Sequence, residues 1–135
     1  MDHACTIEAR LQACENTGRI SLTKSERWIL SEWMVACDRV SHFKEKLIDH
    51  RLQTPFAEVD LLFQARDHLI VVEVKSFDRN LYGDLWHTPA ITKKQLSRLA
   101  MARESLSNRY RLPVRLLVAV VSHPGREVDY FDPMG

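Results

Sequence analysis

The sequence predicts an α/β domain in which a central mixed β-sheet is flanked by α-helices. The 135-residue chain alternates segments of helical and strand periodicity, in the order helix, three strands, helix and one or two further strands. Hydrophobic residues make up 45% and charged residues 27% of the chain, which are ordinary values for a globular domain. Because this length suits one hydrophobic core, we predict a single domain over residues 23–135, preceded by an N-terminal extension over residues 1–22.

The composition argues against several classes of protein. The net charge is +1, so the total charge neither requires nor excludes a nucleic-acid partner. Three cysteines without a C-x-x-C spacing argue against a disulfide framework and against a thiolate metal site. The N-terminal residues lack an apolar signal segment, and no apolar run approaches the ~18 residues of a membrane span. We therefore expect a cytoplasmic protein without a membrane partner.

The first well-marked element is a helix that begins after Thr23. Thr23 and Glu26 form an S/T-x-x-E pattern directly before the apolar-rich segment RWILSEWMVAC, which is typical of a capped helix start. We predict a helix over residues 24–38. In such a start the glutamate can simply close a capping box with the threonine, in which case it carries no chemical role.

Helical spacing gives the two glutamates of this helix different predicted positions. At about 100° per residue, Leu30, Trp33 and Cys37 lie within about 40° of Glu26, so Glu26 projects from near the middle of the apolar face. Glu32 lies about 120° away. The pattern therefore predicts that Glu26 faces the sheet and that Glu32 points sideways.

The other elements follow from periodicity and from turn-forming residues. Alternating or continuous apolar runs predict strands, a 3.6-residue spacing predicts helices, and Gly, Asn and Asp mark loops. We predict a short helix at 6–14, an outer strand within 42–52, a turn at 54–55, strands at 59–63 and 69–74, a loop at 77–89, a helix within 91–106, a buried strand within 112–122 and an edge strand within 126–131.

The two central strands carry charges among their apolar residues. If the hairpin turns through the four residues 65–68, counting back along the strands places Asp60 opposite Glu73 and Glu58 opposite Lys75. Directly opposed residues project to one side of a sheet with their Cβ atoms about 5 Å apart. The pattern therefore predicts a cluster of three carboxylates and one ammonium.

Two interpretations of this cluster differ in what neutralises the acids. A solvated face with a Glu58–Lys75 cross-strand ion pair is common on sheets. It leaves Asp60 and Glu73 as facing like charges, however, which destabilises a hairpin. A divalent cation between the two acids removes this repulsion, and carboxylate oxygens with open water positions are the ligands that Mg²⁺ prefers. We favour the metal site and leave the position of Glu58 open.

Asp60 and the segment Glu73-Val74-Lys75 match the D…(D/E)-x-K motif of the PD-(D/E)XK nuclease superfamily. The segment AEVDLLFQARDHLIVVEVKS, followed by ITKKQLSRLA, further resembles the pattern of the YraN-like family, whose members are similar to Holliday-junction resolvases. The similarity covers residues 25–130. The nuclease-related domain type is the alternative within the superfamily. The resemblance implies a restriction-endonuclease-like core with a mixed sheet between helices.

The resemblance also implies a metal-dependent phosphodiester hydrolase. Asp60 and Glu73 would bind Mg²⁺ or Mn²⁺, the backbone carbonyl of Val74 would add a ligand, and Lys75 would lie beside the attacking water. Many such enzymes add a glutamate from the first helix, and Glu26 is the predicted candidate.

The second long helix supplies the predicted contacts with nucleic acid. Gln95 matches a family position that reaches towards the active site. The segment from residue 93 to residue 115 contains seven basic residues and one acid, a concentration typical of a phosphate-binding surface. We name Lys93, Lys94 and Arg98 as the contacts.

The resemblance implies an endonuclease acting on DNA, including branched DNA, in recombination or repair. Because related junction-cutting enzymes often pair subunits, it also implies a homodimer. A function of a different class is a nuclease-fold module that binds nucleic acid or protein without cleavage, since fold and function separate readily.

Overall fold

A computed structural model of the chain describes residues 9, 23–78, 91–123 and 127–134. The predicted short helix at 6–14, apart from residue 9, and the predicted loop from residue 79 onwards lie outside these residues. The N-terminal extension predicted over residues 1–22 is likewise outside them except for residue 9.

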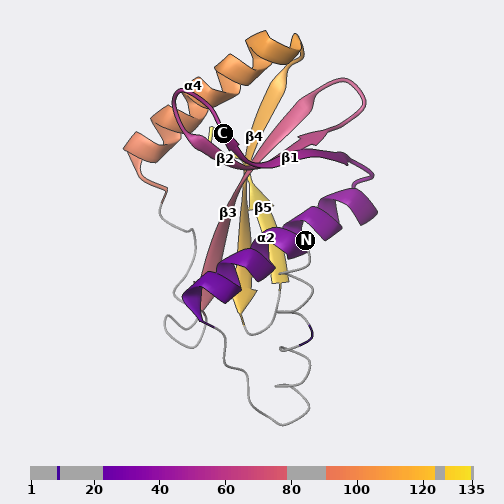
Figure 1. The fold of residues 1–135 in the computed structure, drawn as a ribbon, viewed down its shortest axis with the longest axis vertical. Helices are drawn as coiled ribbons and strands as arrows, with labels where there is room; N and C mark the ends of the chain where they lie inside the picture. Colours follow the sequence, from indigo (N-terminus) through magenta and orange to yellow (C-terminus); the bar gives the residue numbers. More distant parts are fainter. Residues whose placement is uncertain (1–8, 10–22, 79–90, 124–126, 135) are drawn as a thin grey trace.

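Five strands form one mixed sheet in the order β1-β2-β3-β4-β5 (Figure 1). Neighbouring strands are antiparallel except β3 and β4, which are parallel and are joined through α4. This arrangement confirms the predicted α/β class with a mixed sheet. The elements are α2 (Lys24–Ser41), β1 (Lys46–Gln53), β2 (Glu58–Gln64), β3 (Leu69–Asp78), α4 (Lys93–Tyr110), β4 (Val114–His123) and β5 (Glu127–Phe131).

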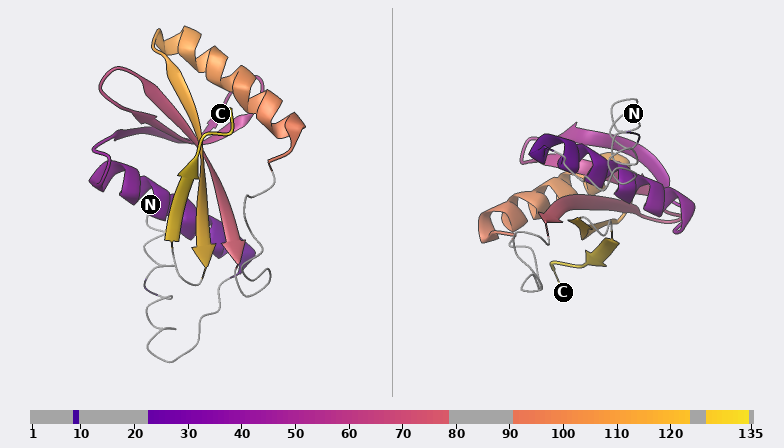
Figure 2. Two further views of the ribbon diagram at one scale, coloured as in Figure 1. Left: turned by 180° about the vertical axis from the view of Figure 1, so that it is seen from behind. Right: turned by 90° about the horizontal axis from the view of Figure 1, so that it is seen from below.

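The two long helices cover opposite faces of the sheet (Figure 2). Successive residues of β3 alternate between the two cores: Ile70 and Val72 pack with Val35 of α2, whereas Val71 packs with Leu99 of α4. This alternation follows from the two-residue period of a strand that is buried on both faces. No helix within the described residues is long and apolar enough to cross a membrane.

Local sequence patterns correctly predicted the β2–β3 turn, the start of α2 and the two edge strands. The amide nitrogen of Ala65 donates a hydrogen bond to the carbonyl of His68 at 2.9 Å, and Gln64 pairs with Leu69, so the predicted four-residue hairpin is confirmed. Thr23 and Glu26 form the predicted capping box. β1 and β5 lie at the two edges of the sheet, as predicted for the outer strand and the tail.

The buried face of α2 differs from the predicted one. The residues buried on the sheet include Ser31, Glu32, Val35 and Arg39, whereas Cys37 is exposed. At about 100° per residue, the predicted face around Glu26 lies opposite Val35. Leu30 of the predicted face is fully buried, but in a separate cluster with Ile29, Trp33 and Met34, whereas Val35 and Ala36 pack in the core against the sheet. Hydrophobic periodicity therefore placed the sheet-facing side of α2 wrongly around Glu26.

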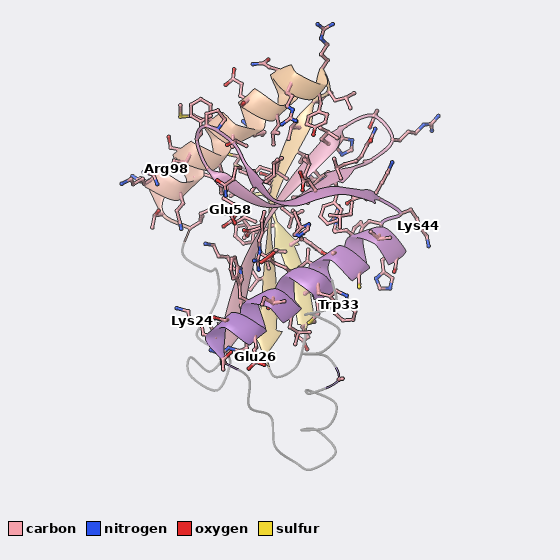
Figure 3. All side chains as sticks on the ribbon, in the orientation of Figure 1. Lys24, Glu26, Trp33, Lys44, Glu58 and Arg98 are labelled. Atoms are coloured by element: carbon pink, nitrogen blue, oxygen red, sulfur yellow. The ribbon has the colours of Figure 1, made fainter. Side chains whose placement is uncertain are left out.

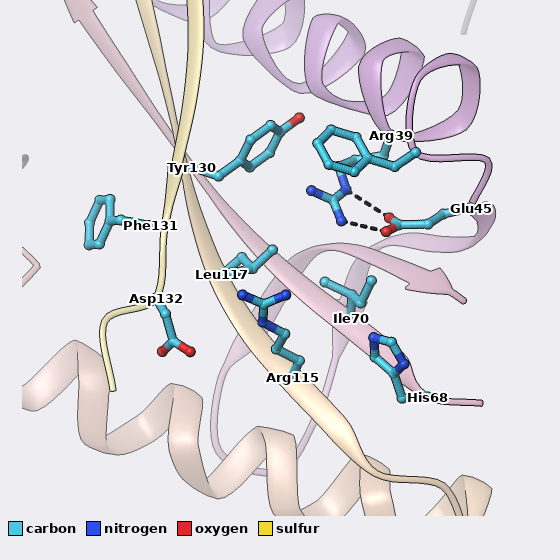
Figure 4. A pocket seen from close by; sticks show the side chains of 10 residues that line it. Arg39, Glu45, His68, Ile70, Arg115, Leu117, Tyr130, Phe131 and Asp132 are labelled. Atoms are coloured by element: carbon cyan, nitrogen blue, oxygen red, sulfur yellow. Dashed lines mark hydrogen bonds and ion pairs between the residues drawn. The ribbon is translucent and has the colours of Figure 1, made fainter. Parts of the chain in front are cut away.

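Arg39 anchors the C-terminal end of α2 (Figure 4). Its Nε donates a hydrogen bond to Glu45 at 2.7 Å, and a second guanidinium nitrogen contacts the other carboxylate oxygen. The guanidinium also lies over the rings of Phe43 and Tyr130, 3.9 and 4.8 Å from their centroids. These groups line a pocket of about 390 Å³. The contacts fix where α2 crosses the sheet and therefore where its other buried polar residues lie.

Candidate active site

The predicted acids lie where two strands of the sheet part. Pairing between β2 and β3 ends at Leu61 and Val72, although β2 remains paired with β1 as far as Glu58 and β3 with β4 as far as Asp78. We call this opening, lined by residues 58–60 of β2 and 73–75 of β3, the fork. The hairpin register is as predicted, and it ends one residue pair before Asp60 and Glu73 would face each other.

Asp60 is fixed at the fork by a backbone hydrogen bond. Its side chain is buried, and the amide nitrogen of Val74 donates to its Oδ2 at 2.8 Å. The N–H and C=O groups of one strand residue point to the same side of the strand, so the Val74 carbonyl is directed towards β2 as well. Burial raises the pKa of Asp60, and the hydrogen bond from Val74 opposes this shift. Asp60 is thus a rigid, desolvated carboxyl group.

Glu73 shares the fork with Asp60 and Lys75. The carboxyl groups of Glu73 and Asp60 are hydrogen-bonded to each other, and the Nζ of Lys75 lies 3.7 Å from Oε1 of Glu73. Burial, followed by the negative charge of Asp60, raises the pKa of Glu73 to about 8 despite the opposing charge of Lys75. The two acids therefore hold a proton between them at neutral pH.

Glu32 brings a third carboxylate towards the fork from α2, which packs against both β2 and β3. Its residue is 4% exposed, its Oε1 lies 3.5 Å from Nε of Arg51, and its Oε2 has no hydrogen-bond partner among the described residues. Burial raises the pKa of Glu32, the charge of Arg51 opposes this, and the charge of Asp60 adds to it. The pKa of Glu32 therefore depends on the charged groups of the fork.

The prediction that Glu26 lies on the sheet-facing side of the helix is wrong. Glu26 occupies the first turn of α2, where its Oε1 accepts a hydrogen bond from the amide of Thr23 at 3.1 Å (Figure 3). It closes the capping box, which was the alternative open from the sequence. The predicted sideways orientation of Glu32 is wrong for the same reason, because both predictions used the same misplaced apolar face. The sequence feature that could have predicted the buried position of Glu32 is its place on the same helix face as the small apolar residues Val35 and Ala36.

Glu58 has a partner other than the one considered from the sequence. Its side chain is exposed, and its Oε2 accepts a hydrogen bond from Nε2 of Gln53 at 2.6 Å. Lys75 makes its ion pair with Glu73 instead. Glu58 therefore lies at the rim of the fork, where its charge acts on Asp60 without direct contact.

The predicted residues of the second helix lie on the surface of α4. Gln95 is exposed, and both of its described hydrogen bonds are to Thr92, with which it forms a capping box. Lys93, Lys94 and Arg98 are also exposed on the first turns of this helix (Figure 3). The structure therefore gives Gln95 a helix-capping contact and leaves the three basic side chains open to solvent.

The donor set of the fork suits a hard cation. Mg²⁺ and Mn²⁺ are bound by carboxylate and carbonyl oxygens, which Asp60, Glu73 and Val74 provide. Within the described segments, no three His, Cys, Asp or Glu side chains are already arranged around a metal position. The pKa of Glu73 is raised despite its ion pair with Lys75, and Oε2 of Glu32 has no hydrogen-bond partner among the described residues although Oε1 faces Arg51. Both carboxyl groups therefore have room for a further positive partner.

This chain is similar to several proteins named UPF0102 proteins. A UPF0102 protein of Shewanella sp. (strain W3-18-1) is 27% identical over 93 residues, which cover 67% of this chain and 84% of that protein. A UPF0102 protein of Fervidobacterium nodosum is 37% identical over 60 residues, covering 42% of this chain and 45% of that protein. One from Shewanella frigidimarina is 34% identical over 65 residues, covering 48% and 58% respectively.

The family model described as uncharacterised protein family UPF0102 matches residues 34–121. This match runs from the middle of α2 to β4, so it contains every fork residue of β2 and β3. The chain therefore belongs to the UPF0102 family, which is the YraN-like family of the PD-(D/E)XK superfamily that its D…ExK motif resembles.

Proposed function

We propose that the protein is a metal-dependent endonuclease that hydrolyses phosphodiester bonds in DNA at the fork. The observation that carries this proposal is the contact between the carboxyl groups of Asp60 and Glu73, with Lys75 3.7 Å from Glu73. Two desolvated acids in contact are unfavourable unless a proton or a cation lies between them. A site that holds two such carboxyl groups in contact therefore favours the binding of a cation.

Asp60, Glu73 and the Val74 carbonyl are the proposed ligands of Mg²⁺ or Mn²⁺, and Glu32 takes the place that the sequence gave to Glu26. The bound metal would polarise the scissile phosphate and lower the pKa of a water molecule. The amide of Val74 holds Asp60 in one orientation through its 2.8 Å hydrogen bond. This preorganisation keeps the first ligand in place before the metal binds.

Lys75 is the proposed neighbour of the attacking water. Its side chain is 25% exposed, so its ammonium group reaches the solvent side of the fork while remaining paired with Glu73. With Glu73 engaged by a cation, the Lys75 ammonium would be available to orient a water molecule or to stabilise charge on the phosphate. Its positive charge also limits the repulsion within the acid cluster.

DNA is the proposed substrate because exposed cations lie together on the first turns of α4. Lys93, Lys94 and Arg98 would contact phosphates, which supply most of the affinity of non-specific binding. Branched DNA in recombination or repair and a homodimer remain parts of this proposal that rest on the family resemblance. A cytoplasmic location is proposed from the composition of the sequence.

A cleavage assay tests the proposal. Labelled duplex, single-stranded and four-way-junction DNA are incubated with the purified full-length protein and Mg²⁺ or Mn²⁺. We expect cleavage that EDTA abolishes and that Asp60→Asn and Lys75→Ala each reduce at least about a hundredfold. Asp67→Asn is the matched control, because Asp67 is exposed in the hairpin turn. Absence of cleavage by the wild type, or equal cleavage by Asp60→Asn, would contradict the proposal.

The second candidate is a module that binds nucleic acid without cutting it. The exposed basic side chains of α4 favour it, because they require no metal for phosphate contact. DNA binding in EDTA by a wild-type protein that cuts none of the three substrates would select this candidate.

A further inference from the structure

Arg51 has an unusual backbone conformation for its position. Among the described residues other than glycine, Lys44, Arg51 and Arg111 have positive φ. Arg111 caps α4 and Lys44 lies between α2 and β1, where the chain reverses. Arg51, with φ 49°, lies inside the strand β1. Left-handed backbone at a long side chain within a strand is unfavourable and persists where surrounding contacts hold it.

The register places Arg51 next to the fork. His50 pairs with Leu61 and Leu52 pairs with Val59, so the position across from Arg51 is that of Asp60. Leu52 packs with the core on the α4 side of the sheet, so its neighbour Arg51 faces the α2 side. There its Nε lies 3.5 Å from Oε1 of Glu32.

The guanidinium of Arg51 is held in place and still open to solvent. Its Cζ lies 4.6 Å from the centroid of the Trp28 ring, a cation–π contact. The Arg51 side chain is 43% exposed, and Trp28 is 37% exposed. By contrast, the side chain of Arg39, which pairs with Glu45 inside the protein, is 5% exposed. Arg51 therefore retains exposed surface that can contact a ligand while its Nε faces Glu32.

We propose that Arg51 binds a phosphate group of the DNA strand that lies at the fork, with Trp28 holding the guanidinium in place. This inference rests on the proposed function and adds a phosphate contact on the side of α2 and β1, separate from the basic residues of α4. A guanidinium offers a planar set of N–H donors whose geometry matches the oxygens of a phosphate group. One edge of the Arg51 guanidinium contacts Glu32, which is a proposed metal ligand. A phosphate bound to the other edge would therefore lie at a fixed distance from Glu32.

A binding assay with full-length protein tests this contact without cleavage. The affinity for labelled duplex DNA and for a four-way junction is measured by fluorescence anisotropy in EDTA over a series of salt concentrations. Arg51→Asn is the main variant, because asparagine tolerates the left-handed conformation. We expect about tenfold weaker binding and a salt dependence, as the slope of log K against log salt concentration, smaller by about 0.9. Arg51→Lys should keep the slope and recover part of the affinity.

Two further variants separate a DNA contact from a loss of structure. Arg66→Asn, in the exposed hairpin turn, is the matched control and should bind as the wild type does. Trp28→Leu leaves the backbone of Arg51 unchanged and should weaken binding about threefold, because the guanidinium loses its stacking partner. Thermal unfolding shows that each variant is folded.

Equal affinity and equal salt slope for Arg51→Asn and Arg66→Asn would overturn the inference while leaving the endonuclease proposal intact. A wild-type protein that neither binds DNA in EDTA nor cleaves it with Mg²⁺ or Mn²⁺ would overturn both. Cleavage that is normal in wild type and in Arg51→Asn, with unchanged binding, would overturn the inference alone.

Discussion

At the scale of single residues, the chemistry of the fork depends on which carboxyl group holds a proton. Burial and the charge of Asp60 raise the pKa of Glu73 to about 8, compared with an ordinary value of 4.5. Burial also raises the pKa of Asp60 and of Glu32. At neutral pH Glu73 therefore holds a proton next to the carboxyl group of Asp60.

The raised pKa of Glu73 predicts how stability depends on pH. Below pH 4.5 the carboxyl group is protonated in both the folded and the unfolded chain. Between pH 4.5 and about 8 the unfolded chain loses this proton while the folded protein retains it, so the free energy of unfolding falls as pH rises. Urea unfolding in EDTA measures this fall over a pH series from about 4 to about 9, which spans the two pKa values.

Glu73→Gln is the control for this dependence. The amide cannot titrate, so its free energy of unfolding should change less with pH than that of the wild type over the same range. Parallel pH curves for the two proteins would show that Glu73 titrates normally and would contradict the described environment of the fork.

The two glutamates of α2 give a second residue-scale prediction. Glu32 is buried towards the fork, whereas Glu26 bonds the backbone of Thr23. Glu32→Gln should therefore lower the Mg²⁺-dependent cleavage rate about tenfold or more. Glu26→Gln should leave the rate and the melting temperature unchanged, because glutamine also closes a capping box. Loss of cleavage in Glu26→Gln, with normal cleavage in Glu32→Gln, would reverse the assignment.

At the scale of elements, the sequence predicted those features that depend on residues close together along the chain, such as helix starts and turns. The capping box at Thr23 fixed the start of α2, and the four-residue turn fixed the register of β2 and β3. The face of α2 was missed because a periodicity analysis assumes that the buried face is the most apolar one. Here that face carries Glu32 and Arg39, whose burial is compensated by ion-pair partners outside the helix, Arg51 in β1 and Glu45 in the connection before it.

The anchor of α2 predicts a large loss of stability when one partner is removed. Arg39→Leu leaves the carboxylate of Glu45 buried without its counter-ion, which should lower the free energy of unfolding by about 3 kcal/mol or more. The double variant Arg39→Leu/Glu45→Leu should be more stable than Arg39→Leu, because no unpaired charge remains. Urea unfolding measures each value.

The exposed pair of Asp67 and His68 is the comparison for this anchor. Asp67→Asn should change the free energy of unfolding far less than Arg39→Leu does, because the carboxylate is 87% exposed and its ion pair is screened by solvent. A loss for Arg39→Leu as small as that for Asp67→Asn would show that the buried pair does not hold α2 in place.

At the scale of the whole molecule, the site exists because the sheet divides into two parts. β1 and β2 remain paired on one side of the fork, and β3, β4 and β5 remain paired on the other (Figure 1). α2 packs against strands of both parts, so a residue of that helix reaches the opening. The motif spacing predicted Asp60, Glu73 and Lys75 as neighbours. It could not predict Glu32 or Arg51, whose positions depend on how α2 crosses the sheet and on a left-handed turn within β1.

The most direct test of the central claim, that the fork is a divalent-metal site, is the anomalous scattering of crystals of the full-length protein grown with Mn²⁺. We predict a manganese peak between the carboxylates of Asp60 and Glu73 and next to the Val74 carbonyl, and its loss in crystals of Asp60→Asn. Ordered crystals with no peak at the fork, or with manganese bound only elsewhere, would contradict the claim.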